Sequence, residues 1–320
     1  MRKALYTIII IIAICLAATV GGSFYMLNFS LSPDANRRDT DSAYALLFKR
    51  MPNMEAWTDS VISNDLLKDT FVTMENGEHQ HAIYMKGDSA HGRTAIIIHG
   101  YKDNAIKFLY MGRMYNRDLG YNILMPDLHA HGLSDGDAIQ MGWKDRKDIV
   151  RWAQIAESIF RDSTSKSSII IHGVSMGAAT TMNVSGDTLP PYIKCFVEDC
   201  GYTSVWDEFA CQLKDIFSLP SFPLMYTTSL LCNIKYGWSF GEASPLKQVA
   251  KCHKPMLFIH GDKDSFVPTW MVYPLYKAKP GEKELWITHG SKHAQSYRDR
   301  PAEYTKRIKA FATKWISNRK

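Results

Sequence analysis

The apolar residues of this 320-residue chain form one long block at the start and several short blocks further on. Residues 4–33 contain no charged side chain, and five isoleucines follow one another at positions 8–12. A helix that crosses a bilayer needs about 20 mostly apolar residues, and residues 4–27 are enough for one. The pattern therefore predicts an N-terminal transmembrane helix within residues 1–33.

A cleaved signal peptide is the alternative for this block. The apolar region of a signal peptide is only about 7–15 residues long and ends at a small-residue cleavage site. The block here is longer, which favours an uncleaved anchor. Cleavage nevertheless stays open, because small residues occur within the second half of the block, at Ala17, Ala18, Gly21 and Gly22.

The charges around the block bear on its orientation. Arg2 and Lys3 favour an N-terminus that stays in the cytoplasm, whereas Arg37 and Arg38 on the other side weaken that bias. We expect a membrane-anchored protein whose main domain is extracytoplasmic.

Short apolar runs rich in β-branched residues fill the rest of the chain. Residues 71–74 and 82–85 flank the turn sequence Asn76-Gly77 and predict an opening hairpin. Six later runs are almost continuously apolar, which is typical of strands buried on both faces. These runs are residues 95–98, 122–125, 169–171, 195–197, 256–259 and 285–287.

Helical patterns alternate with these runs. Apolar residues share one helical face in 149–160, and again in 304–316 near the C-terminus. The alternation predicts an α/β fold in which helices flank a mostly parallel, eight-stranded sheet. We divide the chain into an anchor at 1–33, a tether with a short helix at 34–65, and one domain at 66–320.

An insert at about 202–253 separates two of the expected strands. Val205, Phe209 and Leu213 follow one another at helical spacing, and residues 222–232 are largely apolar. The simpler interpretation is a helix that covers the sheet. The alternative is a small lid whose apolar face receives an acyl chain.

Composition and charge narrow the class of protein. Hydrophobic residues make up 46% of the chain and charged residues 22%, as in an ordinary globular protein. The net charge of +6 is small and gives no support to nucleic-acid binding. None of the six cysteines forms a C-x-x-C pair, so we expect free thiols.

The first candidate for chemistry follows the run at 169–171. Residues 173–177 read Gly-Val-Ser-Met-Gly, and small residues that can start a helix come next. A serine between a buried strand and a helix lies on a sharp turn with its hydroxyl accessible, and glycines are needed on either side. Ser175 is therefore a candidate nucleophile.

A serine nucleophile needs a base, and the base needs a carboxylate that orients it. Asp262 and Asp264 follow the run at 256–259, and His289 and His293 follow the run at 285–287. The order serine, aspartate, histidine, with each residue after a successive strand, is that of the α/β-hydrolase arrangement.

From residue 66 onward the chain resembles the α/β-hydrolase superfamily, above all its small esterases and lipase-like enzymes. The resemblance rests on His99-Gly100-Tyr101, on the segments 127–134 and 261–268, and on the serine turn. It implies that Ser175 is the nucleophile, Asp264 the acid and His293 the base. The backbone N–H of Met176, next to the nucleophile, and that of Tyr101, by the family pattern, would form the oxyanion hole.

Several alternatives remain open within this assignment. Asp262 or Asp199 could replace Asp264, and His289 could replace His293. The pairs His79-x-His81 and His129-x-His131 could seed a metal site, but the further ligands of a metallo-hydrolase do not follow them. We therefore expect no metal ion and no organic cofactor.

These features predict a serine hydrolase that cleaves carboxylic esters through an acyl-serine intermediate. Its partners would be a small-molecule or acylated substrate and the membrane, with no nucleic acid. A peptidase related to prolyl oligopeptidase is the second hypothesis, although such enzymes usually carry a large propeller or extra domain. A catalytically silent binding protein on the same fold is the third.

Overall fold

The computed structural model describes residues 2–161 and 167–316. The chain divides into two compact units. We call the unit formed by Pro33–Thr203 and Pro245–Lys320 the sheet unit, and the unit formed by Met1–Ser32 and Ser204–Ser244 the helical unit. The boundaries expected at residues 33 and 65 stay predictions.

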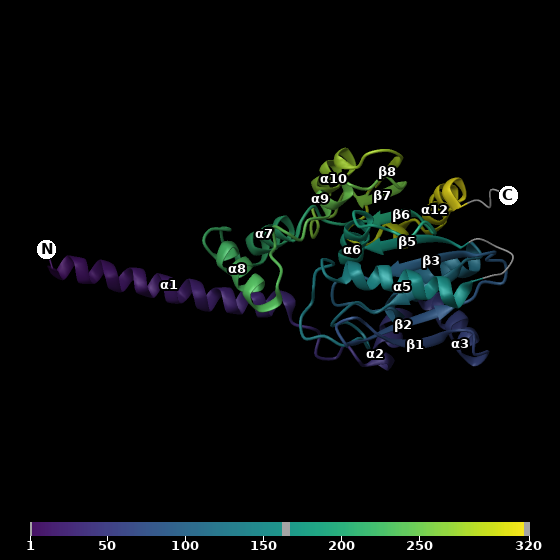
Figure 1. The fold of residues 1–320 in the computed structure, drawn as a ribbon, viewed down its shortest axis with the longest axis horizontal. Coiled ribbons are helices and arrows are strands. Elements are labelled where there is room, and N and C mark those ends of the chain that lie inside the picture. Colours follow the sequence, from purple (N-terminus) through teal and green to yellow (C-terminus); the bar gives the residue numbers. More distant parts are fainter. Residues whose placement is uncertain (1, 162–166, 317–320) are drawn as a thin grey trace. The chain divides into compact units, whose positions relative to one another are not determined.

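The sheet unit is built on one eight-stranded sheet with the strand order β1-β2-β4-β3-β5-β6-β7-β8. The strands run side by side in Figure 1, with β1 and β8 at opposite edges. β2 is antiparallel to both of its neighbours, and the other neighbouring pairs are parallel. The strands are β1 (Lys68–Thr73), β2 (His79–Met85), β3 (Arg93–Ile98), β4 (Asn122–Pro126), β5 (Ser168–Val174), β6 (Ile193–Asp199), β7 (Met256–Gly261) and β8 (Lys283–Thr288).

This sheet confirms the predicted fold class and the opening hairpin. Thr73 pairs with His79 across the turn, where Gly77 has a φ of +84° that a side chain would strain. One expectation about burial is wrong, because β8 is only partly buried. It is an edge strand with one neighbour, so part of its apolar run faces outward.

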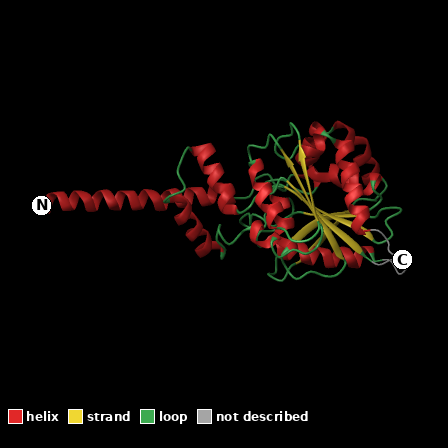
Figure 2. Ribbon diagram, turned by 90° about the horizontal axis from the view of Figure 1, so that it is seen from above, coloured by secondary structure: helices red, strands yellow, loops and turns green. Residues whose placement is uncertain are grey.

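Helices cover both faces of the sheet, as Figure 2 shows for the sheet unit. One layer contains α5 (Asp145–Phe160), α6 (Met176–Ser185), α9 (Pro245–Val249) and α10 (Val272–Ala278), which contact one another in series. The other face carries an extended apolar core cluster, to which α2, α4 and α12 contribute. The remaining elements of the unit are α2 (Thr40–Arg50), η1 (Pro52–Met54), α3 (Glu55–Ser63), η2 (Ile106–Phe108), α4 (Leu109–Arg113), η3 (Met114–Asp118), η4 (Thr269–Met271), α11 (Ser296–Asp299) and α12 (Pro301–Ile316).

The segment from residue 34 to residue 65 is more ordered than its polar composition indicates. We expected a tether with one short helix, and the structure instead has α2 and α3. Leu47 in α2 and Val61 in α3 are buried in the core cluster of the sheet unit. The apolar residues here are few, but they are spaced so that each helix buries one side.

The helical unit consists of α1 (Arg2–Leu31), α7 (Val205–Phe217), α8 (Leu224–Tyr236) and the loops around the last two. Among the described helices, α1 is the one long and apolar enough to cross a membrane, a criterion that a signal sequence also meets. The insert therefore contributes two helices to the unit that holds α1, where the simpler interpretation expected a single helix over the sheet.

Candidate active site

Ser175 lies on a sharp turn between β5 and α6. Its φ of 59° and ψ of −120° fall in a region that residues with a side chain rarely adopt. A backbone hydrogen bond of 2.8 Å from Ser175 N to Asp199 O helps to hold the turn. Such stored strain is typical of functional positions. The backbone conformation of Ser175 thus differs from that of the strand before it and from that of the helix after it.

The two glycines around Ser175 leave no room for a side chain. A Cβ on Gly173 would lie 1.9 Å from the carbonyl oxygen of Gly177, and a Cβ on Gly177 would lie 2.2 Å from that of Ile98. The turn is therefore packed directly against the carboxyl end of β3.

This close packing predicts that Gly173→Ala destabilises the protein by about 1–3 kcal/mol or more, because backbone must move to admit the methyl group. Thermal unfolding followed by circular dichroism measures the change. Gly241→Ala is the matched control, since a Cβ there has no atom within 4 Å. Equal unfolding temperatures for the two variants would contradict the packing argument.

His293 joins Ser175 to Asp264. Its Nε2 is 2.8 Å from Ser175 Oγ, and its Nδ1 is 2.8 Å from Asp264 Oδ2. A carboxylate only accepts hydrogen bonds, so Nδ1 carries the proton and Nε2 accepts from the serine hydroxyl. The three residues come from the loops after β5, β7 and β8. The structure thus brings together the three residues predicted from the sequence.

Asp264 accepts three hydrogen bonds and has a further histidine close by. Its Oδ1 accepts the N–H groups of Phe266 and Val267, both at 3.0 Å. Its Oδ2 accepts from His293 and, at 3.4 Å, faces Nε2 of His260. Burial raises the pKa of Asp264, but the hydrogen bonds from the two histidines outweigh burial and bring the pKa below its usual range. The carboxylate is therefore ionised at neutral pH.

The alternative residues have other partners. Asp262 forms a separate pair with the exposed His289, at 2.6 Å. Asp199 accepts from the hydroxyl of Tyr304 at 2.9 Å. Burial raises the pKa of Asp199 to about 6, and the bond from Tyr304 offsets only part of that rise. Neither of these two aspartates has a hydrogen bond to His293 among those the structure describes.

The loop that carries Tyr101 is held by two buried histidines. His99 Nδ1 donates to the carbonyl oxygen of Gly100 at 2.7 Å, and its Nε2 accepts from Leu128 N at 3.0 Å. His131 Nε2 accepts from Lys102 N at 3.1 Å. Burial lowers the pKa of both histidines, which keeps the neutral form that can accept. Both neighbours of Tyr101 are therefore fixed.

The loop also lies next to the serine. A Cβ on Gly100 would be 3.5 Å from Cβ of Ser175, and Met176 is the first residue of α6. The two backbone donors expected for an oxyanion hole therefore belong to two segments that both adjoin the serine. The sequence motifs contained His99 and His131, but only the fold reveals that they position this loop.

Asp127 connects the same loop to the hairpin. It accepts from Ala105 N at 2.8 Å, from Leu133 N at 2.9 Å and from His81 Nδ1 at 2.7 Å. The other ring nitrogen of His81 pairs with Asp69 at 2.9 Å. The sequence suggested His81 only as a possible metal ligand, whereas the structure places it between two carboxylates.

This position predicts a pH-dependent stability. Burial alone would lower the pKa of His81, but the bonds to Asp127 and Asp69 outweigh it and raise the pKa to about 9. The unfolded value is about 6.5, so protonated His81 stabilises the fold fully below pH 6.5 or so. That contribution is lost as the pH rises through about 9.

Denaturant unfolding at several pH values tests this prediction. The free energy of unfolding should fall more steeply between pH 6.5 and 9 in the wild type than in His81→Gln. The difference between the two curves isolates His81, because the other titrating groups are common to both. His289→Gln, which removes an exposed histidine, should follow the wild type. A constant difference between the wild type and His81→Gln across this range would contradict it.

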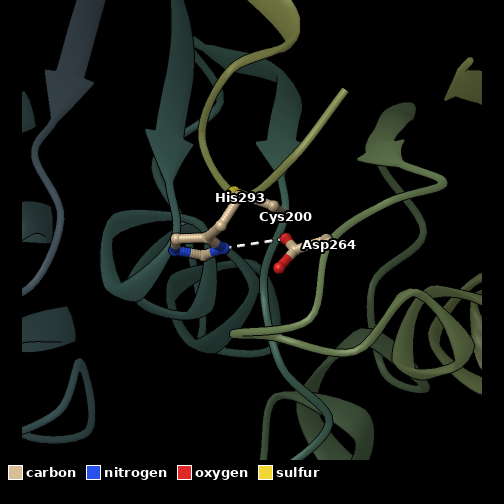
Figure 3. Close-up of side chains that lie close together, drawn as sticks. All are labelled: Cys200, Asp264 and His293. Atoms are coloured by element: carbon tan, nitrogen blue, oxygen red, sulfur yellow. Dashed lines mark hydrogen bonds and ion pairs between the residues drawn. The ribbon is translucent and has the colours of Figure 1, made fainter. Parts of the chain in front are cut away.

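Cys200, Asp264 and His293 form a group whose candidate ligand atoms lie within 4.8 Å of one another (Figure 3). Burial raises the pKa of the Cys200 thiol well above its usual value, so the thiolate that a metal prefers is disfavoured. Both ring nitrogens of His293 already have partners. The chemistry of this group fits proton transfer better than metal binding.

Known proteins resemble this chain in sequence and in fold. Residues 110–319 match the prolyl oligopeptidase family. The chain belongs to that family. A curated relative from Bacillus subtilis (strain 168), the uncharacterized protein YqkD, is 31% identical over 219 residues, which make up 68% of this chain and 70% of that protein.

Two solved structures share the fold. An esterase of Pyrococcus furiosus has a TM-score of 0.63 and 23% identity, and the match covers 80% of this chain and 96% of that one. An acylaminoacyl peptidase of Pyrococcus horikoshii has a TM-score of 0.58 and 15% identity, over 82% of this chain and 44% of that one. As a member of the prolyl oligopeptidase family with the α/β-hydrolase fold, the protein is a serine hydrolase.

Proposed function

We propose that this protein of the prolyl oligopeptidase family is a serine esterase. It would cleave carboxylic esters through an acyl-serine intermediate on Ser175. The observation that carries the proposal is the hydrogen-bonded series from Ser175 through His293 to Asp264, with both links at 2.8 Å. In that series an ordinary hydroxyl gains a base within reach, and the base gains a fixed carboxylate.

The first half of the reaction forms the acyl-enzyme. His293 Nε2 takes the proton from Ser175 Oγ as the oxygen attacks the ester carbonyl, and Asp264 stabilises the imidazolium that results. The carbonyl oxygen becomes an oxyanion, which the N–H groups of Met176 and Tyr101 would receive. The dipole at the start of α6 favours negative charge at the first of these donors. The imidazolium then protonates the alcohol oxygen, and the alcohol leaves.

The second half releases the acid. A water molecule gives its proton to His293 Nε2 and attacks the acyl carbonyl through a second tetrahedral oxyanion. The carbon–oxygen bond to Ser175 breaks, and the imidazolium returns the proton to the serine. The residues proposed for this cycle suffice for it, and no metal ion or organic cofactor has a role in the proposal.

Peptidase activity is the specific alternative to ester hydrolysis. Membership of the prolyl oligopeptidase family favours a peptidase, and the acylaminoacyl peptidase of P. horikoshii shares the fold. The match to the P. furiosus esterase, however, takes in 96% of that chain, whereas the match to the peptidase takes in 44%. Nearly all of the P. furiosus esterase therefore aligns with this chain. This supports an ester, rather than a peptide, as the first choice of substrate.

Paired substrates separate the two activities. Purified protein is given p-nitrophenyl esters and p-nitroanilides that carry the same acyl or aminoacyl group, and kcat/KM is compared for each pair. The Ser175→Ala variant supplies the background of spontaneous hydrolysis, which matters most for the esters. Faster turnover of the esters, after correction for their higher intrinsic reactivity, supports the proposal. Faster turnover of the anilides would make the protein a peptidase.

We further propose that α1 is an uncleaved anchor and that the sheet unit lies outside the cytoplasm. The support is the length of the uncharged segment, from residue 4 to residue 33, and the basic pair at Arg2 and Lys3. A small-molecule or acylated substrate would then meet the enzyme at the membrane. Carbonate extraction of membranes, together with mass spectrometry of the N-terminal peptide, distinguishes an anchor from a cleaved signal.

A further inference from the structure

A row of apolar side chains on the helical unit is exposed. Tyr226, Leu230 and Ile234 of α8 repeat every four residues, a spacing that places successive side chains on one side of a helix, and Phe222 lies just before α8 begins. The exposed fractions are 73% for Phe222, 58% for Tyr226, 60% for Leu230 and 75% for Ile234. Leu219, in the loop between α7 and α8, is also exposed. We call these five residues the apolar ridge.

The ridge lies in a segment without charge. No residue from 216 to 234 is charged, and Asp215 and Lys235 stand at its two ends. A helix on the surface of a soluble protein normally turns charged residues outward, and large exposed apolar patches mark surfaces that meet a partner. The exposed side of α8 is therefore apolar where an ordinary solvent-facing helix carries charged residues.

Contacts within the helical unit place the start of α8 next to a defined part of α1. Ser23 Oγ and Thr227 Oγ1 are 2.6 Å apart. A Cβ on Gly22 would lie 3.2 Å from Leu224 Cδ1. At the end of α7, the ring of Phe217 packs edge-on against that of Phe29, with centroids 5.4 Å apart. The connection between α7 and α8 therefore runs beside residues 22–29 of α1.

The length of α1 indicates where its contact with the start of α8 lies relative to a bilayer. Residues 2–18 are exposed, while from Thr19 onward one side of the helix is covered. About 20 residues are needed to cross the hydrocarbon core, so a span that starts at Ala4 ends near Ser23. The residues of α1 that would leave the hydrocarbon core are thus those that contact the start of α8.

We propose that the apolar ridge enters the surface of the lipid bilayer that holds α1. The connection between α7 and α8, together with one face of α8, then forms a second membrane contact whose ligand is the boundary between lipid headgroups and acyl chains. The absence of charge from 216 to 234 suits burial at that depth, and Tyr226 brings an amphipathic ring of the kind that favours this boundary. This inference rests on α1 being an anchor and is independent of the reaction at Ser175.

Spin labels on the full-length protein test the proposal. The accessible thiols Cys15 and Cys211 are replaced by serine, and single cysteines are introduced at Tyr226, at Ile234 and, as an exposed control on α12, at Lys309. The labelled proteins are reconstituted into vesicles of phosphatidylcholine and phosphatidylglycerol. Collisions of each label with oxygen, which enriches in lipid, and with a water-soluble nickel chelate are then compared by electron paramagnetic resonance.

The expected result is a severalfold rise in the ratio of oxygen to nickel collisions at positions 226 and 234 over position 309. A ratio at the ridge equal to that at 309 overturns the proposal. Low access to both reagents, with dipolar broadening between labels, would mean that a second copy of the chain covers the ridge, and this result overturns the proposal too. A label on the native Cys15, in protein that keeps this thiol, reports separately whether α1 lies in the membrane.

Charged substitutions on the ridge provide a second test. Leu230→Lys combined with Ile234→Lys should return the label at 226 to the ratio found at 309, while the label at Cys15 keeps its membrane ratio. Both positions are more than half exposed, so the fold should persist, which far-ultraviolet circular dichroism checks. Asn233→Lys, on the same helix but off the ridge, is the matched control and should change nothing. If the double variant leaves the ratio at 226 unchanged, the apolar ridge does not hold α8 at the membrane, and the proposal is overturned.

Discussion

Replacement of Ser175 by alanine lowers the kcat for ester hydrolysis by about 10⁶-fold, the order of loss seen when the nucleophile of such a series is removed. The variant has no oxygen that His293 can activate, so the acyl-enzyme cannot form. What remains is the acceleration that positioning and the backbone donors give to attack by water. Turnover of a p-nitrophenyl ester under saturating substrate measures the loss.

A fluorophosphonate probe provides an independent readout of the same residue. It labels the wild type at Ser175 and leaves Ser175→Ala unlabelled. Ser63→Ala, which removes an exposed hydroxyl from α3, should label and turn over substrate as the wild type does. If wild type and Ser175→Ala are labelled equally, the site is not an activated serine. The protein would then be a binding protein on a hydrolase fold.

The sheet and the serine turn could be predicted from the sequence because their signals are local. Each buried strand is a short apolar run, and the turn at Ser175 needs Gly173 and Gly177 for steric reasons that the motif itself records. β8 was the exception for burial, because its apolar run looks like those of the inner strands. Its place at the edge of the sheet depends on strand order, which no single run contains.

The surroundings of the site depended on contacts between distant segments. His99 and His131 stand 32 positions apart, yet they hold the two neighbours of Tyr101. The side of α8 that contacts Ser23 could not be recognised from its own residues, because apolar positions occur all round this helix. Sequence patterns show that a residue is apolar or polar, but they do not show which distant segment it meets.

The role of His260 could not be predicted from the sequence either, although it lies only four residues from Asp264. It ends a buried strand, and its sequence position gives no reason to connect it with Asp264 four residues later. In the structure its Nε2 lies 2.9 Å from the carbonyl oxygen of Val267 and 3.4 Å from Asp264 Oδ2. It therefore lies near the same carboxylate oxygen that accepts from His293, and it helps to keep Asp264 ionised.

Asp264→Asn lowers kcat by about 10⁴-fold, which corresponds to a loss of about 5 kcal/mol of transition-state stabilisation. The amide group is nearly the same size, so the packing around it should persist. It lacks the negative charge that stabilises the imidazolium, and its NH₂ group can turn toward His293 and favour the wrong tautomer. The effect should appear in kcat far more than in KM, because Asp264 touches the base and not the substrate.

Two matched variants decide whether this loss belongs to Asp264 alone. Asp262→Asn changes the aspartate of the exposed pair with His289 and should leave kcat near the wild-type value. Asp199→Asn keeps an acceptor for the Tyr304 hydroxyl and should cost far less activity than Asp264→Asn. A larger loss in Asp199→Asn would move the acid to the end of β6. In that case the hydrogen bond between His293 and Asp264 would be structural, and Asp199 would be the carboxylate that stabilises the imidazolium.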